Sequence, residues 1–311
     1  MLSTSKRLIR LIANPRAGRN GKARAAQIAR FSELMRAHGV ETEVVHTTAA
    51  GEATQLAAQA AREGVREVVV SGGDGTINEA LQGLVGSHVR LGIWPAGTAN
   101  VLARELRLPF AAEGLADMVA RGETRTVQIG SATKEATGER RYFFLMAGLG
   151  LDASVVDRVN PGLKRRVGEG AYWYAGFAHL TSWPPPSFTL EVAGQIIPAT
   201  FAVVGKAARY GGGLGITPRA RLDHPEFEIC VVNSHSRLRY INLLLHAMRP
   251  GGVAERVPGV RYLRAGRVRA DGDALVQVDG ELIGRLPMTF EIAPHQLEII
   301  APRVGYSDKL K

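Results

Sequence analysis

The sequence predicts an α/β fold in two parts: a first domain built on a parallel sheet, and a β-rich, mostly antiparallel second domain. Three observations support this prediction. Strand and helix patterns alternate over the first 125 residues, short strand patterns dominate after Gly122, and a glycine-rich turn at residues 72–75 connects a strand to a helix. Such alternation is typical of parallel strands with helices on both faces of the sheet.

The first domain is expected at residues 1–125, where each of four strands precedes a helix. The strand patterns cover 8–13, 43–47, 68–71 and 90–94, and the helical patterns cover 21–38, 52–62, 76–85 and 98–106. Ligands of such sheets bind beyond the carboxyl ends of the strands. Those ends carry Asn14-Pro15, Thr47-Thr48, Gly72 to Gly75, and Pro95 to Thr98.

The second domain is expected at residues 126–294, where most strand patterns are separated by turn residues. They cover 126–131, 142–147, 188–192, 197–204, 227–232, 268–270, 274–278 and 288–292, and helical patterns interrupt them at 169–182 and 238–248. This order predicts mostly antiparallel strands. The last strand pattern, 296–300, leaves open whether residues 295–311 rejoin the first domain.

Length and composition indicate a globular protein of ordinary type. The chain has 311 residues, enough for two cores, and 45% of them are hydrophobic. No run of eighteen apolar residues predicts a membrane-spanning helix, and the N-terminus lacks the apolar core of a signal peptide. The single cysteine, Cys230, excludes an internal disulfide and is expected to be an inert strand residue. These features favour a cytoplasmic protein.

The net charge of +10 is unusual and is compatible with nucleic acid, an anionic membrane or a phosphorylated substrate as partner. A basic background with arginines spread over the surface would explain it equally well. Arg158, Lys164, Arg165 and Arg166 cluster, however, and the aromatic residues 172–174 follow them. Basic residues beside aromatic ones suit a membrane interface, at about 1 kcal/mol per cation on anionic lipid. We therefore expect peripheral membrane association and no nucleic-acid partner.

The turn at residues 72–79 carries the strongest chemical signal. Asp74-Gly75 alone would suggest a hairpin, but the residues from Thr76 onward have a helical pattern. Thr76 and Glu79 have the spacing of a capping box, which predicts that Thr76 caps this helix. Glycines allow close backbone approach, and N–H groups at a helix start bind phosphate. With Asp74 serving Mg²⁺, the turn predicts a nucleoside triphosphate site and phosphoryl transfer.

Two further loops follow neighbouring strands. The loop 14–22 would be an ordinary turn if it stood alone, and it is not a Walker loop because Ala23 replaces the metal-binding hydroxyl. In the loop 95–104, Gly97 allows close approach, and Thr98 and Asn100 offer hydrogen bonds. Three such loops on adjacent strand ends support a shared ligand site.

The second domain offers two carboxylates with weak local signals. Asp152 follows an apolar strand, although a solvated turn residue would have the same pattern. Glu281 lies in Val278-Asp279-Gly280-Glu281, which locally favours a structural hairpin turn. Histidines lack zinc-type spacing, and there is no nucleophile elbow. Phosphoryl transfer needs few catalytic side chains, because it relies on positioning and charge neutralisation.

Taken in order, these motifs resemble the diacylglycerol kinase catalytic-domain family, which includes bacterial lipid kinases, diacylglycerol kinases, sphingosine kinases and ceramide kinases. The resemblance extends from Asn14 to Pro302. The Gly72 to Thr76 turn is shared with phosphofructokinases and NAD kinases, so it is not specific alone. The ordered set is specific, and it also comprises Asn14-Pro15 with Gly18, Pro95 with Gly97-Thr98 and Asn100, Gly148 with Gly150 and Asp152, and Asp279-Gly280-Glu281.

The resemblance implies an active site in a cleft between an ATP-binding, phosphofructokinase- or NAD-kinase-like first domain and a β-sandwich-like, lipid-binding second domain. It implies that Asp74 serves Mg²⁺-ATP, that Glu281 accepts the proton of the lipid hydroxyl, and that Asp152 lies near the lipid head group. The residues expected to line the nucleotide are Asn14, Pro15, Gly18, Thr47, Gly72, Gly73, Asp74, Gly75, Thr76, Asn78, Gly97, Thr98 and Asn100.

The sequence departs from the family pattern at two places. Bacterial members often carry Asp-Asp-Gly in the second domain, where the second Asp helps to hold a structural Mg²⁺. Here the matching segment, 220–227, has His224-Pro225 in place of Asp-Gly. Val101 stands where an Asp often follows the Gly-Thr-x-Asn motif. Both changes remove a carboxylate, so we expect the structural metal site to be absent and the catalytic Mg²⁺ to be kept.

The resemblance predicts an ATP- and Mg²⁺-dependent kinase that phosphorylates a diacylglycerol-like lipid to phosphatidic acid. Alternative acceptors are a sphingoid base, ceramide, phosphatidylglycerol or a glycolipid. A nucleotide acceptor is disfavoured by the motifs at 95–100 and 148–152. A non-catalytic lipid-binding or regulatory protein is a further alternative, against which the presence of both Asp74 and Glu281 argues. The oligomeric state, including a homodimer, is left open.

Overall fold

The computed structural model describes residues 7–18, 21–151, 153–154, 184–209, 213–249 and 257–302. The chain divides into two compact units, Met1–Val127 with Gln296–Lys311, and Gln128–His295. Several sequence predictions lie outside the described residues: Asp152, the basic cluster from Arg158 to Arg166, and the helix at 169–182.

Unit 1 contains a parallel sheet with the strand order β2-β1-β3-β4-β16. Its strands are β1 (Arg7–Ala13), β2 (Val40–His46), β3 (Glu67–Gly72), β4 (Arg90–Pro95) and the end of β16 (Met288–Ile300), which pairs with β4 at Ile299. β3 is buried along its whole length. This burial explains its continuous run of valines, because a parallel strand is covered on both faces.

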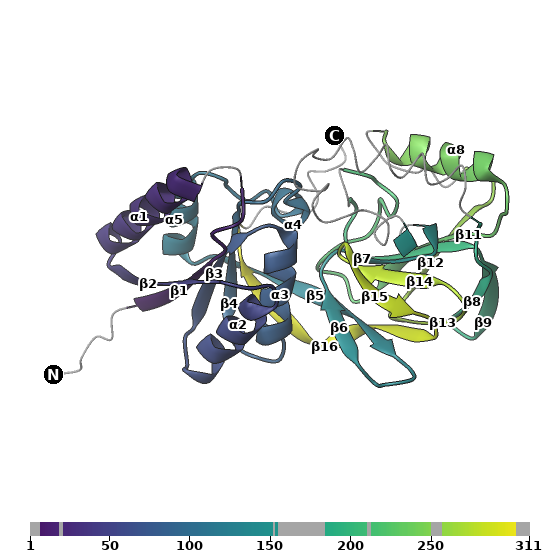
Figure 1. The fold of residues 1–311 in the computed structure, drawn as a ribbon, viewed down its shortest axis with the longest axis horizontal. Coiled ribbons are helices and arrows are strands. Elements are labelled where there is room, and N and C mark those ends of the chain that lie inside the picture. Colours follow the sequence, from purple (N-terminus) through teal and green to yellow (C-terminus); the bar gives the residue numbers. More distant parts are fainter. Residues whose placement is uncertain are drawn as a thin grey trace. The chain divides into compact units, whose positions relative to one another are not determined.

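Helices of unit 1 pack in two pairs, which Figure 1 shows on opposite sides of the sheet. One pair is α1 (Gly21–Ala37) with α5 (Ala112–Arg121), and the other is α2 (Glu52–Arg62) with α3 (Asp74–Leu84). Gly83 lets the second pair approach closely, since a Cβ there would lie 2.2 Å from the carbonyl oxygen of Thr54. A short helix, α4 (Val101–Glu105), follows β4.

Unit 2 contains two sheets that are mainly antiparallel. One has the order β12-β11-β10-β7-β14-β15, and the other joins β16, β13, β8 and β9, with β5 pairing to β16 and β6. The strands are β5 (Thr124–Lys134), β6 (Arg140–Phe143), β7 (Met146–Leu149), β8 (Phe188–Val192), β9 (Gln195–Ala199), β10 (Phe201–Gly205), β11 (Phe227–Val232), β12 (Val260–Ala265), β13 (Arg267–Gly272), β14 (Leu275–Val278) and β15 (Glu281–Arg285).

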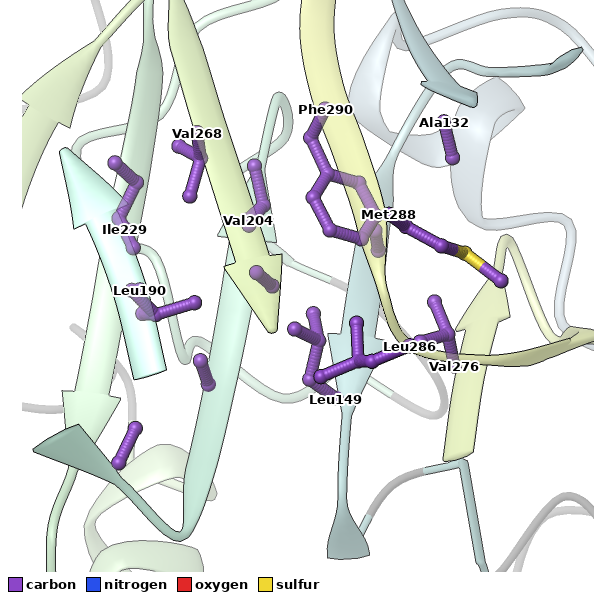
Figure 2. Packing of buried hydrophobic residues seen from close by; sticks show 14 of the residues in the cluster. Ala132, Leu149, Leu190, Val204, Ile229, Val268, Val276, Leu286, Met288 and Phe290 are labelled. Carbon is purple, nitrogen blue, oxygen red and sulfur yellow. The ribbon is translucent and has the colours of Figure 1, made fainter. Parts of the chain in front are cut away.

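The core of unit 2 lies between its two sheets. The labelled side chains in Figure 2 come from both sheets and point toward one another. They include Leu149, Val204, Ile229 and Val276 from one sheet, and Leu190, Val268, Met288 and Phe290 from the other. Together with the strand pairing, this packing gives a β-sandwich-like unit.

Helix α8 (Arg237–Ala247) covers the outer face of the β10 and β11 sheet (Figure 1). Its buried residues Tyr240, Leu243 and Ala247 pack in one cluster with Phe201 and Cys230. Both faces of β10 and β11 are therefore buried, which explains their continuous apolar sequences. Burial raises the pKa of the Cys230 thiol to about 12, so the thiol is inert at neutral pH.

Among the described residues, no helix is both long enough and apolar enough to cross a lipid bilayer.

Candidate active site

The loops after β1, β3 and β4 meet at one edge of the unit 1 sheet. The backbone N–H of Asn14 donates to the carbonyl of Ser71 at 2.9 Å, and that of Ala96 donates to the carbonyl of Gly72 at 2.9 Å. The Asn14 side chain also reaches α3, because its Nδ2 donates to Oγ1 of Thr76 at 2.9 Å. The structure therefore brings together the three loops that the sequence indicated.

Each predicted nucleotide residue can be placed at this edge. Asn14, Pro15 and Gly18 follow β1, and the buried Thr47 follows β2 and donates its backbone N–H to Ala13 at 3.0 Å. The others lie at the end of β3 and the start of α3, or between β4 and α4: Gly72, Gly73, Asp74, Gly75, Thr76, Asn78, Gly97, Thr98 and Asn100.

Two close contacts at this edge require glycine. A Cβ on Gly72 would lie 2.5 Å from Cβ of Thr76, and a Cβ on Gly97 would lie 2.6 Å from Cα of Gly73. Both distances are shorter than any ordinary contact. Gly72 and Gly97 are thus explained by the fold itself, because a larger residue at Gly72 would clash with Thr76 of α3, and one at Gly97 would clash with the loop after β3.

Gly75 has no such explanation. It is exposed in the first turn of α3, its φ is not positive, and a Cβ built on it meets no atom within 4 Å. An alanine would favour the helix by about 1 kcal/mol. The open space over this helix start, together with its backbone N–H groups, suits a bound phosphate that must approach closely.

Asp74 lies at the start of α3 and faces the start of α4. Its Oδ1 accepts a hydrogen bond from the Leu102 N–H at 3.4 Å, and the N–H groups of Val101 and Asn100 also bind its carboxylate. These donors and the positive ends of the helices favour the charged form. Burial outweighs them and raises the pKa of Asp74 above its usual value. The result is a partly buried carboxylate at the shared edge.

Asn100 organises the loop after β4. It adopts a left-handed conformation with a φ of 47°. Its Oδ1 accepts from the Gly97 N–H at 2.8 Å, and its Nδ2 donates to the Gly97 carbonyl at 2.8 Å. Asn100 therefore braces the loop from within, whereas Thr98 is exposed and free to face a ligand.

The predicted capping box at Thr76 and Glu79 is wrong. Helix α3 begins two residues earlier, at Asp74, and its N-cap residue Gly73 makes no side-chain capping bond. The Thr76 hydroxyl is buried and accepts the hydrogen bond from Asn14 instead. A partner on a neighbouring loop, sixty-two positions away, overrides the local pattern.

Sequence patterns did not indicate Arg24, which lies beneath this edge. It is buried in α1, its Nε donates to Oγ of Ser71 at 3.1 Å, and its guanidinium lies 4.0 Å from the centre of the Trp94 ring. Burial lowers the pKa of Arg24 to about 10, which leaves it positive at neutral pH. Arg24 therefore places a positive charge next to Ser71, the residue before Gly72.

In unit 2, Asp279 holds the turn that carries Glu281. Its carboxylate accepts three consecutive backbone N–H groups, those of Phe144 at 2.8 Å, Leu145 at 2.9 Å and Met146 at 3.0 Å. Asp279 and Gly280 both have positive φ, as a tight hairpin turn requires.

Glu281 is the first residue of β15 and is exposed. Its Oε2 lies 2.5 Å from Nη2 of Arg141 in β6, a partner that the sequence did not indicate. Asp152, the other predicted residue of this unit, is outside the described residues. In the parts of the chain that are described, no three His, Cys, Asp or Glu side chains form a metal cluster.

Comparisons with known proteins agree with this architecture. Residues 8–132 match the diacylglycerol kinase catalytic domain, and residues 146–301 match the YegS C-terminal NAD kinase beta sandwich-like domain. A diacylglycerol kinase of Mycobacterium tuberculosis strain H37Rv is 32% identical over 303 residues, which cover 94% of this chain and 95% of that protein. A diacylglycerol kinase of Bacillus subtilis strain 168 is 29% identical over 304 residues, covering 94% and 96% of the two chains.

A solved structure of a candidate diacylglycerol kinase from Bacillus anthracis strain Sterne shows the same fold. Its TM-score is 0.79 at 21% identity, and the match covers 96% of this chain and 97% of that one. At this identity the likeness shows the fold alone. It confirms the predicted α/β part and the β-sandwich-like part.

The fold and the matched domains define a kinase that acts on lipids. The chain belongs to the diacylglycerol kinase catalytic-domain family, as the resemblance predicted.

Proposed function

We propose that this protein transfers the γ-phosphoryl group of ATP to the hydroxyl of a diacylglycerol-like lipid and so forms phosphatidic acid. The observation that carries the proposal is similarity over 94% of the chain to a protein named diacylglycerol kinase, at 32% identity. The site geometry supports a kinase, because an open helix start at Gly75 lies beside the partly buried carboxylate of Asp74 at the edge of a parallel sheet.

The unit 1 edge fits ATP with its metal ion. The N–H groups at the start of α3 would bind phosphate over Gly75, and Thr98 and the loop of Asn14 to Gly18 would line the nucleotide. Mg²⁺ is usually held by one or two carboxylates together with substrate phosphates. Asp74 would supply that carboxylate, and the bound ion would neutralise phosphate charge. The buried cation of Arg24 would add to the positive potential behind the loop.

Glu281 is proposed as the group that accepts the proton from the lipid hydroxyl. As that oxygen forms its bond to the γ-phosphorus, the bond from phosphorus to the bridging oxygen of ADP breaks, and ADP leaves. Asp279 and Arg141 would position the Glu281 carboxylate. Asp152 is proposed to lie near the lipid head group.

The acceptor is tested with radiolabelled ATP and a panel of lipids: diacylglycerol, sphingosine, ceramide, phosphatidylglycerol and a glycolipid. Label in phosphatidic acid is the expected result. Label found only in another lipid would identify that lipid, rather than diacylglycerol, as the acceptor. Label in no lipid, with ATP still bound, would favour a lipid-binding or regulatory role. Isothermal titration of ATP with and without Mg²⁺ tests the metal independently of turnover, and we expect tighter binding with Mg²⁺.

We also propose that the enzyme reaches its substrate on an anionic membrane surface, with the cations from Arg158 to Arg166 as one contact. Binding to anionic vesicles should then weaken as salt rises, because exposed charges are screened within about 8 Å at physiological ionic strength. It should also weaken when Lys164, Arg165 and Arg166 are changed to Gln. If neither higher salt nor these substitutions weakened vesicle binding, the proposed contact would be refuted.

A further inference from the structure

A lysine side chain is enclosed in the segment that departs from the family pattern. Lys206 follows β10 and is 0% exposed. Its Nζ donates to the carbonyl of Arg221 at 2.9 Å, to that of His224, and to that of Glu226 at 3.4 Å. An ammonium has three N–H donors, and all three are used by carbonyl groups of this one loop.

The loop 221–226 is therefore an oxygen-lined cation site. Backbone carbonyls are typical ligands of hard cations such as Mg²⁺ and Ca²⁺. Here the nearby carboxylate of Asp223 favours the charge of Lys206, although Asp223 itself is held by Arg221, with Oδ2 2.8 Å from Nη2. Burial lowers the pKa of Lys206 to about 8, so the ammonium form still prevails at neutral pH.

The same loop contains His224-Pro225 at the position where bacterial members of the family often carry the Asp-Gly of a structural metal site. A divalent ion would have to share these carbonyls with a positive ammonium, so the residues present do not fit a metal. We propose that the ammonium of Lys206 replaces a structural metal ion in the loop 221–226, so that unit 2 keeps its fold without a divalent cation.

The backbone of Lys206 connects to the turn that carries Glu281. Its backbone N–H donates to the Leu145 carbonyl at 2.7 Å, and the Leu145 N–H donates to Oδ1 of Asp279 at 2.9 Å. On another side, the Gln128 N–H donates to the carbonyl of Leu222 at 2.8 Å. Lys206 thus ties the loop to the strands that support Asp279.

The first test uses the wild-type chain without nucleotide, so it does not depend on catalysis. The melting temperature, Tm, is measured after exhaustive EDTA treatment and again with Mg²⁺ or Ca²⁺ added. We expect the three values to agree within about 1 °C, because ion binding to the folded state alone would raise Tm. A fall with EDTA that Mg²⁺ reverses would overturn the proposal.

The second test compares two substitutions of the lysine. Lys206→Met keeps much of the volume but leaves the carbonyls without a donor, and we expect Tm to fall by about 5 °C or more. Lys206→Ala also opens space, so propylammonium chloride should restore part of its Tm and leave Lys206→Met unchanged. Sodium chloride at equal ionic strength controls for salt, and Lys134→Ala controls for loss of a more exposed lysine. A Lys206→Met variant as stable as wild type would refute the role.

A separate observation concerns the outer face of α8. Leu238, Leu245 and Met248 are 76%, 51% and 56% exposed. With the partly buried Ile241 they follow helical spacing and form one stripe, here called the outer stripe, while Tyr240, Leu243 and Ala247 face the core. A helix that is apolar on two faces needs a partner for the second one.

The charges around this helix indicate what that partner is. Residues 233–249 contain Arg237, Arg239 and Arg249 and no Asp or Glu, and all three arginines are exposed. Leucines flanked by arginines on a surface helix are typical of segments that lie in the interface of anionic membranes. Because the family acts on lipids, we infer that the outer stripe of α8 docks on an anionic lipid surface.

Vesicle binding without ATP tests this inference, so its failure is distinct from failure of the kinase activity. Leu238→Glu and Leu245→Glu should each weaken binding to vesicles of phosphatidylcholine with phosphatidylglycerol by about tenfold, because each loses the burial of one leucine. Ile196→Glu is the matched control, since Ile196 is 75% exposed in β9 and should tolerate the change.

Vesicles of phosphatidylcholine alone should bind the wild type more weakly, because they lack the anionic charge that the arginines recognise. Unchanged vesicle binding by both leucine variants would overturn the inference. A change of oligomeric state in sedimentation velocity, with vesicle binding unchanged, would assign the outer stripe to contact between copies of the chain.

Discussion

The Nη2 atom of Arg141 lies 2.5 Å from Oε2 of Glu281, while the neighbouring Asp279 fixes the turn through three backbone N–H groups. The Glu281 side chain is 56% exposed and that of Arg141 is 25% exposed. A pair with one partner so exposed contributes at most about 1 kcal/mol. The arrangement therefore orients the Glu281 carboxylate without making the fold depend on it.

Glu281→Gln should separate catalysis from stability. Loss of a general base typically reduces the rate by about 10² to 10⁴-fold, because the hydroxyl proton has no acceptor. Tm should change by no more than about 2–4 °C, since only an exposed pair is lost. Turnover with the preferred lipid and calorimetry measure the two effects. Glu291→Gln, which removes a half-buried partner of the exposed Arg267, is the matched control and should keep full turnover. Full turnover in Glu281→Gln would refute the proposed role.

Asp279→Ala should impair both stability and turnover. The substitution leaves three partly buried backbone N–H groups without an acceptor. Each group that water cannot reach should lower the free energy of unfolding by roughly 1–3 kcal/mol. The turn also loses a residue that tolerates positive φ. Chemical denaturation gives the free energy of unfolding. Asp273→Ala, which removes an exposed partner of Arg285, should leave that free energy nearly unchanged. Equal stability of the two variants would contradict the anchoring role.

Regular elements of unit 1 were predictable because their periodicity is strong and local. The valine run at 68–70 lies inside β3, and the four alternating strand and helix patterns correspond to β1 through α4. Helix α5 was missed, although its buried residues Leu115, Met118 and Val119 have helical spacing. The start of α3 was misplaced because the Thr76 hydroxyl is taken by Asn14 rather than by its own helix.

In unit 2 the predicted patterns 142–147 and 197–204 each span two strands, β6 with β7 and β9 with β10. The sequence missed two further strands, β12 and β15. Both lie at the ends of their sheet, and both carry charged residues that interrupt the apolar alternation. Charges on edge strands prevent unwanted pairing, and they also weaken the signal by which a strand is recognised. The hairpin turn at Asp279-Gly280 was predicted correctly from its local pattern.

Three charged side chains that the sequence did not indicate share one property. Arg24 meets Ser71, Arg141 meets Glu281, and Lys206 meets the carbonyls of the loop 221–226. Each partner is distant in the sequence, so no local pattern contains it. Motifs indicate where a backbone must bend or approach a ligand. The partner of a charged side chain can be identified only when the fold shows which distant residues lie next to it.

Gly75→Ala tests whether phosphate approaches the start of α3. The variant should be as stable as wild type or more stable by about 1 kcal/mol, because alanine favours a helix and its Cβ meets no protein atom. ATP affinity should fall about tenfold or more if the methyl group occupies the place of a phosphate oxygen. Titration calorimetry with ATP and Mg²⁺ measures this affinity.

Gly97→Ala is the contrasting variant. Its Cβ would lie 2.6 Å from Cα of Gly73, so the loop must shift and Tm should fall. If Gly75→Ala bound ATP as well as wild type, the phosphate would not lie over α3. If Gly97→Ala were as stable as wild type, the close packing of the two loops would be in error.

Asp74→Asn should abolish turnover without lowering the stability of the nucleotide-free protein. Burial raises the pKa of Asp74, so folding disfavours its ionised form. That cost is fully present above the folded-state pKa. It disappears as pH falls toward the unfolded-state value, because the native protein then binds the proton more readily. Asparagine never carries the charge, so at pH 7 the variant should melt at the same temperature or higher.

Melting curves of the variant and the wild type from pH 4 to pH 8 therefore distinguish the effect of ionised Asp74 from that of protonated Asp74. Any advantage of Asp74→Asn over the wild type should shrink as pH falls, while ATP binding of the variant should lose its dependence on Mg²⁺ at every pH. Asp117→Asn, which changes an exposed carboxylate on α5 that lies 3.6 Å from His38, is the matched control and should keep turnover. If the variant melted well below wild type at pH 7, this expectation would be wrong. The hydrogen bonds from backbone N–H groups would then stabilise the Asp74 carboxylate by more than its burial destabilises it.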